Sequence, residues 1–259
     1  MMMAFLQHTW YMTWRHMKPM LRRPIMIVMS MIQPIVWLLL FSGLFRKVVD
    51  IPGFETDSYI SFLLPGIIVM NALFVGVFTG MGTVIDLNNG VIDRFLISPV
   101  ERVTFILGKL IQQAVLFVVQ SLILIVLSVM IGAKFSGPIY GVFIVIAGAV
   151  LLGVAVGALS IGFALITRRI ESMVSMMQFI TLPLMFLSSA LMPQDLAPAW
   201  MKVVGYFNPV NWAVLTGRNA FRTNADWEVV LLNGSFVLVF AIVCVLLSTR
   251  AFRAYQRSV

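Results

Sequence analysis

Six apolar runs, each long enough to cross a bilayer, constrain the fold of this chain more than any other feature. A membrane-spanning helix needs about 20 predominantly apolar residues with few or no charges. Only 11% of the 259 residues are charged and 61% are hydrophobic, whereas a soluble domain carries roughly 25% charged residues. We therefore predict an all-α polytopic membrane protein whose transmembrane domain covers residues 25–249. Its six transmembrane helices are expected at residues 25–45, 59–83, 103–131, 138–167, 172–191 and 229–249.

Two local patterns predict how these helices bend and pack. In the first run Pro34 follows Gln33, and a proline removes a backbone donor, so a bend is expected there. The fourth run holds a GxxxG pair, Gly153 and Gly157, which lets another helix approach closely. We expect this contact inside one subunit, with a seam between two subunits as the alternative.

Residues 1–24 predict an amphipathic helix that lies in the lipid headgroup layer. Apolar side chains, Trp10 and Trp14 among them, recur at helical spacings of three and four residues. Arg15 and Lys18 occupy another face, and aromatic and basic faces of this kind suit an interfacial helix. The alternative is a disordered basic tail.

The distribution of charge predicts the orientation. If the N-terminus is cytoplasmic, the inner segments hold 12 of the 18 Lys and Arg residues but only 4 of the 10 Asp and Glu residues. The net charge of +8 then lies entirely inside, which is the positive-inside pattern. We predict a multi-pass protein of the cell (inner) membrane with both termini cytoplasmic and a cytoplasmic tail at residues 250–259. The positive charge indicates membrane topology rather than nucleic-acid binding.

Residues 86–102, DLNNGVIDRFLISPVER, form a mixed-charge stretch set directly between two runs. A plain linker needs only about 2–8 residues, whereas this stretch combines apolar side chains with charges of both signs. Pro99 is expected to end any helix at Ser98. We interpret the stretch as a cytoplasmic docking helix, with the corner at residues 168–171 as a second contact; a solvated linker is the alternative.

Residues 192–228, on the opposite side, predict two short helices rather than one span. The stretch has too many apolar residues for a loop and too many prolines for a single crossing, and Asn208-Pro209 is a break. Non-helical backbone at membrane depth must be sheltered by protein, so we expect a re-entrant pair packed over the bundle. An ordinary extracellular loop is the alternative.

Several chemistries have no counterpart in this sequence. No GxxxxGK[ST] motif is present, and Gly108-Lys109 is followed by Leu110, so the chain does not cradle ATP phosphates itself. His8 and His16 both precede the first run, which leaves no histidine in the runs for a catalytic base or a metal site. No run carries a central charge of the kind that marks an ion relay. We expect no catalytic residue, bound cofactor or metal, and an energy source on another chain.

Three segments carry a resemblance to a known family: residues 58–70 (SYISFLLPGIIVM), 86–110 (DLNNGVIDRFLISPVERVTFILGKL) and 181–221 (TLPLMFLSSALMPQDLAPAWMKVVGYFNPVNWAVLTGRNAF). The chain resembles the membrane (permease) subunit of type-2 ABC exporters, and within it the daunorubicin-resistance permease group. The first pattern of that group is matched by Asp86, Gly90, Asp93, Arg94, Phe95, Ser98 and Pro99. The later pattern is matched by residues 186–189, Pro193, residues 198–200, Asn208 and Pro209.

The resemblance implies roles for these segments. Residues 86–102 would be a coupling helix seated in a groove of a separate ABC ATPase subunit, present in two copies and carrying ATP and Mg. A second permease subunit, either an identical chain or a sister chain, would complete the complex. The residues expected to couple to the ATPase are Asp86, Leu87, Gly90, Val91, Asp93, Arg94, Phe95, Pro99, Arg102, Arg168, Arg169 and Glu171. The residues expected to form an outer lid are Pro193, Pro198, Trp200, Asn208 and Pro209.

The cargo is expected to be hydrophobic or amphiphilic. By resemblance, the second and fifth runs line the path, and their aromatic, thioether and amide side chains suit a flat amphiphile. The path residues are then Asn71, Phe74, Phe78, Met177, Gln178, Thr181, Met185 and Phe186, although such stripes also serve packing or face lipid. A drug or antibiotic is the first expectation, and a lipid-linked glycan or other envelope lipid the second. A membrane assembly protein without transport activity is the further alternative.

Overall fold

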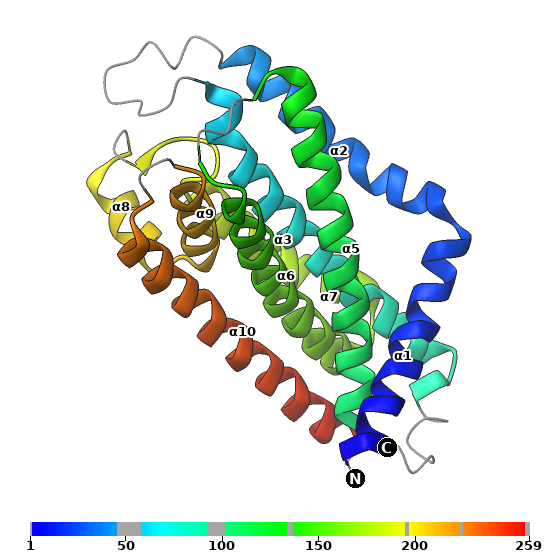
Figure 1. Ribbon diagram of the computed structural model, residues 1–259. Helices are drawn as coiled ribbons and strands as arrows, with labels where there is room; N and C mark the ends of the chain where they lie inside the picture. Colours follow the sequence, from blue (N-terminus) through cyan, green and yellow to red (C-terminus); the bar gives the residue numbers. More distant parts are fainter. Residues whose placement is uncertain are drawn as a thin grey trace.

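The computed structural model describes residues 2–45, 58–92, 102–133, 137–194, 197–222 and 225–256. Across these ranges every regular element is a helix (Figure 1). The elements are α1 (Met2–Arg22), α2 (Pro24–Leu44), α3 (Tyr59–Asn88), α5 (Arg102–Ile131), α6 (Tyr140–Thr167), α7 (Ile170–Phe186), α8 (Ala199–Tyr206), α9 (Pro209–Ala220) and α10 (Trp227–Gln256). The all-α prediction is confirmed for this part of the chain.

Within the described ranges, five helices are long and apolar enough to span a membrane, so the chain is an integral membrane protein. They lie at Ile27–Leu44, Tyr59–Asn88, Val103–Ile131, Tyr140–Thr167 and Trp227–Gln256. The predicted fifth span, residues 172–191, corresponds to α7, which has only 17 residues and a length of about 25 Å. That prediction placed the end of the helix too late: Leu187 caps α7, and the chain turns after it.

Two other predicted boundaries were wrong for the same reason: each helix continues beyond the end of its apolar run. α3 extends to Asn88 and so includes Asp86 and Leu87, which the sequence places in a separate coupling helix. It ends where Gly90 adopts a positive φ of 65°, a conformation that favours glycine after a helix. α10 runs through Gln256 rather than ending at residue 249, because Phe252 and Tyr255 are buried.

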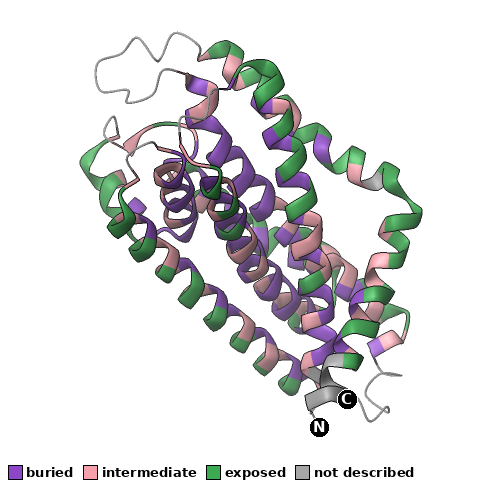
Figure 2. Ribbon diagram, in the orientation of Figure 1, coloured by how far each residue is buried: buried purple, intermediate pink, exposed green. Residues whose placement is uncertain are grey.

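α3 and α6 form the centre of the bundle, and the other long helices surround them. Figure 2 shows buried residues concentrated along α3 and α6, while α2 and α10 expose one side along their length. Each glycine of the GxxxG pair on α6 packs against α5: Gly153 lies against the ring of Phe117, and Gly157 against Gln113. The predicted packing role of this pair inside one subunit is confirmed.

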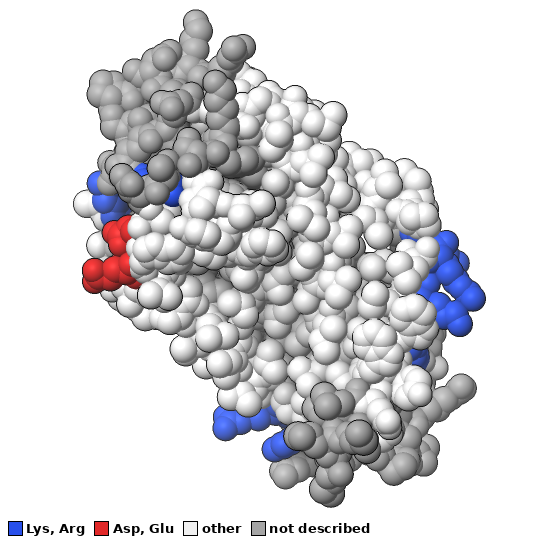
Figure 3. All heavy atoms as spheres, in the orientation of Figure 1, with Lys and Arg blue, Asp and Glu red and all other residues white. Residues whose placement is uncertain are grey.

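Both chain ends lie at the same end of the bundle (Figure 1), which we call the near end; the opposite end, with α8 and α9, is the far end. Charged side chains on the face shown in Figure 3 gather toward the two ends and leave a broad uncharged belt between them. At the near end, α1 is a helix that packs across α5 and leaves Trp10 and Trp14 exposed. The predicted N-terminal helix is confirmed, and its position in the headgroup layer stays a prediction.

The closest contact between α3 and α6 yields a stability test. The backbone N–H of Gly80 donates a 3.0 Å hydrogen bond to Ser160 Oγ, and a Cβ at Gly80 would collide with the Ser160 backbone. Gly80→Ala should therefore lower the free energy of unfolding by about 1–3 kcal/mol, visible as a lower Tm of the purified protein. Gly82→Ala is the matched control, because only the end of the Lys109 side chain lies near that position. Equal Tm values for the two variants would contradict this packing.

Candidate functional site

The predicted coupling segment falls partly outside the described residues. Asp93, Arg94, Phe95 and Pro99 lie in residues 93–101, outside the described ranges, so their coupling role stays a prediction. The structure does show both flanks of this segment. Asp86 and Leu87 lie in the last turns of α3, Gly90 and Val91 follow it, and Arg102 begins α5. The segment therefore leaves one spanning helix and returns directly into the next.

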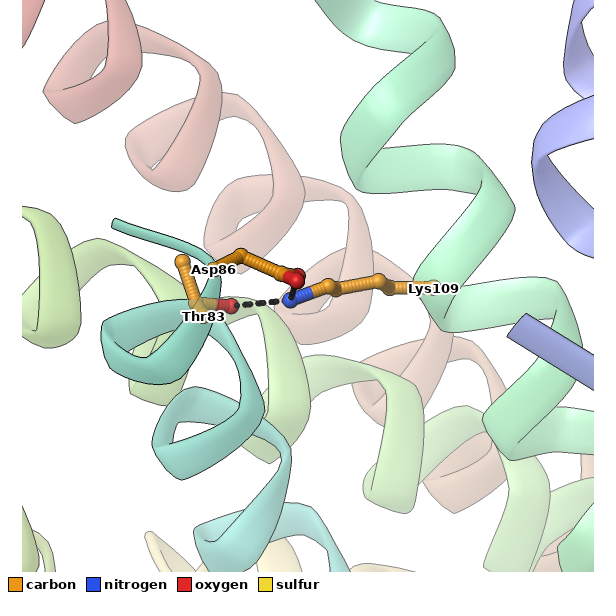
Figure 4. A network of polar contacts seen from close by, with 3 residues as sticks. All are labelled: Thr83, Asp86 and Lys109. Carbon is orange, nitrogen blue, oxygen red and sulfur yellow. Dashed lines mark hydrogen bonds and ion pairs between the residues drawn. The ribbon is translucent and has the colours of Figure 1, made fainter. Parts of the chain in front are cut away.

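A buried ion pair ties the two flanks together. Lys109 Nζ on α5 lies 2.5 Å from Asp86 Oδ2 on α3 and donates a 3.0 Å hydrogen bond to Thr83 Oγ1 (Figure 4). The Lys109 side chain is 7% exposed and that of Asp86 19%. We call Thr83, Asp86 and Lys109 the α3–α5 anchor. Burying this pair is costly for each ion alone, so the anchor holds the ends of α3 and α5 in one register.

Helix α1 covers the anchor from outside. The Lys109 ammonium lies 4.9 Å from the centre of the Phe105 ring, and His16 of α1 packs edge-on against that ring at 6.0 Å. Burial, reinforced by the positive charge of Lys109, lowers the pKa of His16 to about 4. His16 is therefore uncharged at neutral pH, and α1 adds an aromatic contact to the anchor rather than another charge.

The second predicted coupling corner is exposed at the near end. Arg168 ends α6 in a left-handed conformation, with φ of 54°, and its guanidinium lies 4.8 Å from the centre of the Tyr255 ring of α10. Arg169 caps the start of α7, and Glu171 lies in its first turn. All three side chains are exposed, so they are available to a partner, and their coupling role stays a prediction.

The predicted path residues are divided among three separate cavities. Asn71, Phe74 and Phe78 line a cavity of about 140 Å³ between α2 and α3. Met177 and Thr181 line a small one of about 40 Å³ among α3, α6, α7, α9 and α10. Met185 and Phe186 line a third, of about 250 Å³, beside residues 187–194 and 197–201. Gln178 is exposed and lines none of the three. A common path for these residues stays a prediction.

A chain of polar side chains crosses the interior between α2, α3 and α5. Asn71 Nδ2 donates a 2.8 Å hydrogen bond to Gln120 Oε1, and Gln120 Nε2 donates a 2.8 Å bond to Ser30 Oγ. Gln120 is fully buried. Sequence reasoning selected Asn71 but missed Gln120 and Ser30, because nothing in the spacing of single amides indicates which helices they join.

At the far end, the predicted break at Asn208-Pro209 is confirmed, and α8 and α9 are the two short helices on either side. Asn208 caps α9 by accepting a 2.9 Å bond from the Val210 N–H, and it donates a 2.6 Å bond to the Leu184 carbonyl. Asn211 accepts from the Ser189 N–H and donates to the Gly205 carbonyl, both at 3.0 Å. These bonds join α8 and α9 to the end of α7.

The other predicted lid residues border this region. Pro193 and Pro198 line the cavity beside the end of α7, and Trp200 on α8 is exposed. Sequence reasoning missed Arg218 on α9, whose Nη2 donates a 2.8 Å bond to the Ser189 carbonyl and whose guanidinium lies 3.6 Å from the centre of the Phe62 ring. The far end is thus closed by hydrogen bonds and one cation–π contact, while its role as a lid stays a prediction.

The sequence profile described as ABC-2 type transporter matches residues 7–221. This range runs from α1 through α9 and includes the α3–α5 anchor, the cavity between α2 and α3, and the helical pair at the far end. Among the residues that the structure describes, no group of three His, Cys, Asp or Glu side chains could hold a metal ion.

Several curated proteins are similar over most of the chain. The daunorubicin resistance ABC transporter permease protein DrrB1 of Streptomyces coeruleorubidus is 25% identical over 232 residues, which cover 88% of this chain and 81% of that protein. A protein named as a transport permease, ycf38, of Porphyra purpurea is 30% identical over 210 residues, 80% of this chain and 71% of the relative. A protein of Mycobacterium tuberculosis, named as the doxorubicin resistance ABC transporter permease DrrC, is 24% identical over 164 residues, 62% of this chain and 58% of the relative.

The α3–α5 anchor yields a prediction for stability. Lys109→Met leaves the mostly buried Asp86 carboxylate, 19% exposed, without its partner and should cost about 3 kcal/mol of unfolding free energy. Asp86→Asn combined with Lys109→Met removes both charges and should cost less than the single change. Thermal unfolding of the purified protein measures both. A double variant less stable than Lys109→Met would show that the pair does not behave as a coupled unit.

His16 yields a prediction for pH. A detached α1 would bind a proton near the ordinary pKa of 6.5, whereas docked His16 binds one only near 4. Docking of α1 is therefore fully favoured above pH 6.5 and weakens as the pH falls toward 4. Hydrogen exchange in α1, corrected for the intrinsic rate, should be faster at pH 5 than at pH 7.5. In a His16→Gln variant, which cannot titrate, the two corrected rates should agree; an unchanged wild-type rate would contradict the prediction.

Proposed function

This chain belongs to the ABC-2 type transporter family, and on that premise we propose that it is the transmembrane subunit of an ATP-driven exporter. The family supplies the membrane component of ABC transporters and implies an ABC ATPase partner. The absence of a phosphate-binding loop from the sequence supports hydrolysis of ATP on that separate subunit. In this proposal two ATPase copies carry ATP and Mg, and two permease chains, identical or sister, pair around the transport path.

The α3–α5 anchor is the observation that carries the coupling part of the proposal. A segment that transmits a push from a soluble motor must be attached rigidly to the helices it moves. Asp86 and Lys109 hold its two flanks together through a 2.5 Å ion pair, so a displacement of residues 87–108 acts on α3 and α5 jointly. Arg168, Arg169 and Glu171 provide a second exposed surface for the ATPase.

The positions of the termini support six crossings with both ends in the cytoplasm. Both ends of the chain lie at the near end (Figure 1), which requires an even number of crossings. Five described helices are long enough to span, so α7 is taken as the remaining crossing. The excess of Lys and Arg in the near-end segments supports a cytoplasmic position for that end. α8 and α9 become the outer re-entrant pair, above the end of α7.

For the cargo we propose a hydrophobic or amphiphilic drug or antibiotic. Two relatives are named for resistance to daunorubicin and doxorubicin, and the cavities of this chain are lined by aromatic, thioether and amide side chains that suit such molecules. Export of a lipid-linked glycan or another envelope lipid is the alternative cargo. A membrane assembly role without transport is the alternative function.

The test is ATP-driven export by this chain reconstituted with a partner ABC ATPase subunit. Phe95→Ala and Arg94→Ala should abolish export and cargo-stimulated ATP hydrolysis while the permease still inserts and elutes as one species. Phe207→Ala at the far end and Arg253→Ala on α10 are the matched controls, because both side chains are exposed outside the proposed contact, and they should retain activity. Full coupling in the Phe95 and Arg94 variants would refute the docking role. Complex formation without flux of any tested cargo would favour the assembly role.

A further inference from the structure

The amide of Gln33 lies where a bilayer offers it no partner. It is the tenth residue of the 21-residue helix α2, so it is close to the middle of that span. Its side chain is exposed, and within the described ranges it makes no hydrogen bond. Water is absent from the hydrocarbon core, so an unpaired amide there costs free energy, and a polar side chain at such a position indicates a functional site.

A backbone acceptor that lacks its usual helical donor lies one turn earlier on the same helix. Pro34 has no N–H, so the carbonyl of Ser30 loses the hydrogen bond that the helix would otherwise give it. Ser30, Gln33 and Pro34 line the same cavity. Asn71 faces them from α3, and its position is set by the 2.8 Å bond to Gln120. Ser30 Oγ and Asn71 Nδ2 are bonded within the protein, whereas the Gln33 amide makes no hydrogen bond among the described residues.

The rest of the cavity is apolar and aromatic. Trp37 on α2 and Phe74 and Phe78 on α3 provide ring surfaces, and Met29 and Met70 provide flexible thioethers. The volume of about 140 Å³ is comparable with an engineered cavity of about 150 Å³ that takes up benzene. Met29 and Phe78 are 58% and 48% exposed, so the cavity opens sideways toward lipid rather than toward either end of the bundle.

The side chains that line the cavity indicate which charge its ligand can carry. Among the residues that the structure describes, none of the side chains lining this cavity is charged. A charged group at this depth would find no opposite charge and would pay the full cost of leaving water. A ligand with an uncharged hydroxyl or carbonyl can instead pair with the amide of Gln33 and place an aromatic ring among the three aromatic side chains.

We propose that the cavity between α2 and α3 is a lateral binding site for an uncharged aromatic amphiphile, with its hydrogen-bonding group on Gln33. In this inference the cavity is where a cargo dissolved in the bilayer first contacts the permease. That role for the site rests on the proposed export function. Binding itself does not require ATP or the coupling segment, so it is tested separately from transport.

The experiment is photolabelling of the permease–ATPase complex in lipid vesicles with 4-(hydroxymethyl)benzophenone, an uncharged alcohol whose excited carbonyl inserts readily into methionine C–H bonds. Peptides are mapped by mass spectrometry. We expect saturable labelling at Met29 or Met70. The same photophore as a cation, (4-benzoylbenzyl)trimethylammonium, or as an anion, 4-benzoylbenzoate, should label these residues at least about fivefold less, given the cost of a charge at this depth.

Gln33→Leu tests the named contact. The variant should lower labelling about fivefold to tenfold, which is the effect of losing one hydrogen bond. Its fold should be intact because the amide has no partner among the described residues. Gln112→Leu is the matched control: this amide on α5 bonds Met20 Sδ at 3.4 Å, lies outside the cavity, and should leave labelling unchanged.

The outcomes separate this inference from the proposed function. The site would be overturned by labelling that does not saturate, by equal labelling with all three charge forms, or by unchanged labelling of Gln33→Leu. It would also be overturned if a second copy of the chain covered the cavity and prevented its labelling. Saturable, charge-selective labelling without any ATP-driven export would uphold the site and refute the export function. Export that proceeds without labelling of α2 or α3 would uphold the function and refute the site.

Discussion

In the hydrocarbon core of a bilayer each polar group must find its partner inside the protein, and the structure of this chain follows from that requirement. Hydroxyl groups within the spans turn back to their own helix, as Thr79 and Thr249 do by donating to carbonyls four residues earlier. Ser160 receives the Gly80 N–H across the α3–α6 contact. The amides of Asn71 and Gln120 pair with each other. Each of these bonds selects one rotation of a helix among several that would bury the same apolar area.

At the near end, the polar groups are paired by an ion pair instead of by hydrogen bonds between uncharged groups. Asp86 and Lys109 enter the bundle as a pair, and the aromatic ring of Phe105 covers the ammonium. Because truncating either partner would leave the other buried and unpaired, the ends of α3 and α5 are held as one body. Helix α1 packs over the anchor through an uncharged histidine. In the proposed function, the contact that stabilises these helix ends is also the one that would transmit force.

At the far end, short-range capping takes the place of ion pairs. Asn208 and Asn211 supply the donors and acceptors that α8 and α9 lack at their ends, and Arg218 spreads its charge over two carbonyls and one aromatic face. Gln33 differs, because its amide makes no hydrogen bond among the described residues and lines a cavity near the middle of α2. Buried polar atoms such as Arg218 Nε and Gln194 Nε2 also have no partner among the described residues, so it is the cavity around Gln33, and not the missing bond alone, that indicates a binding site.

The sequence by itself determined what depends on local rules. Hydropathy located the long helices, the spacing of α1 predicted a helix, and Asn208-Pro209 predicted the break between α8 and α9, because chain composition and proline geometry act over a few residues. The family resemblance was also readable, since motif order lies along the chain. Tertiary structure alone decided which helices meet. It paired Lys109 with Asp86, divided Asn71, Met177 and Met185 among three cavities, and ended α7 at Phe186. These outcomes depend on how each helix is rotated about its axis and packed against its neighbours. The mean hydropathy of an apolar helix does not change with that rotation, so hydropathy does not encode the packing.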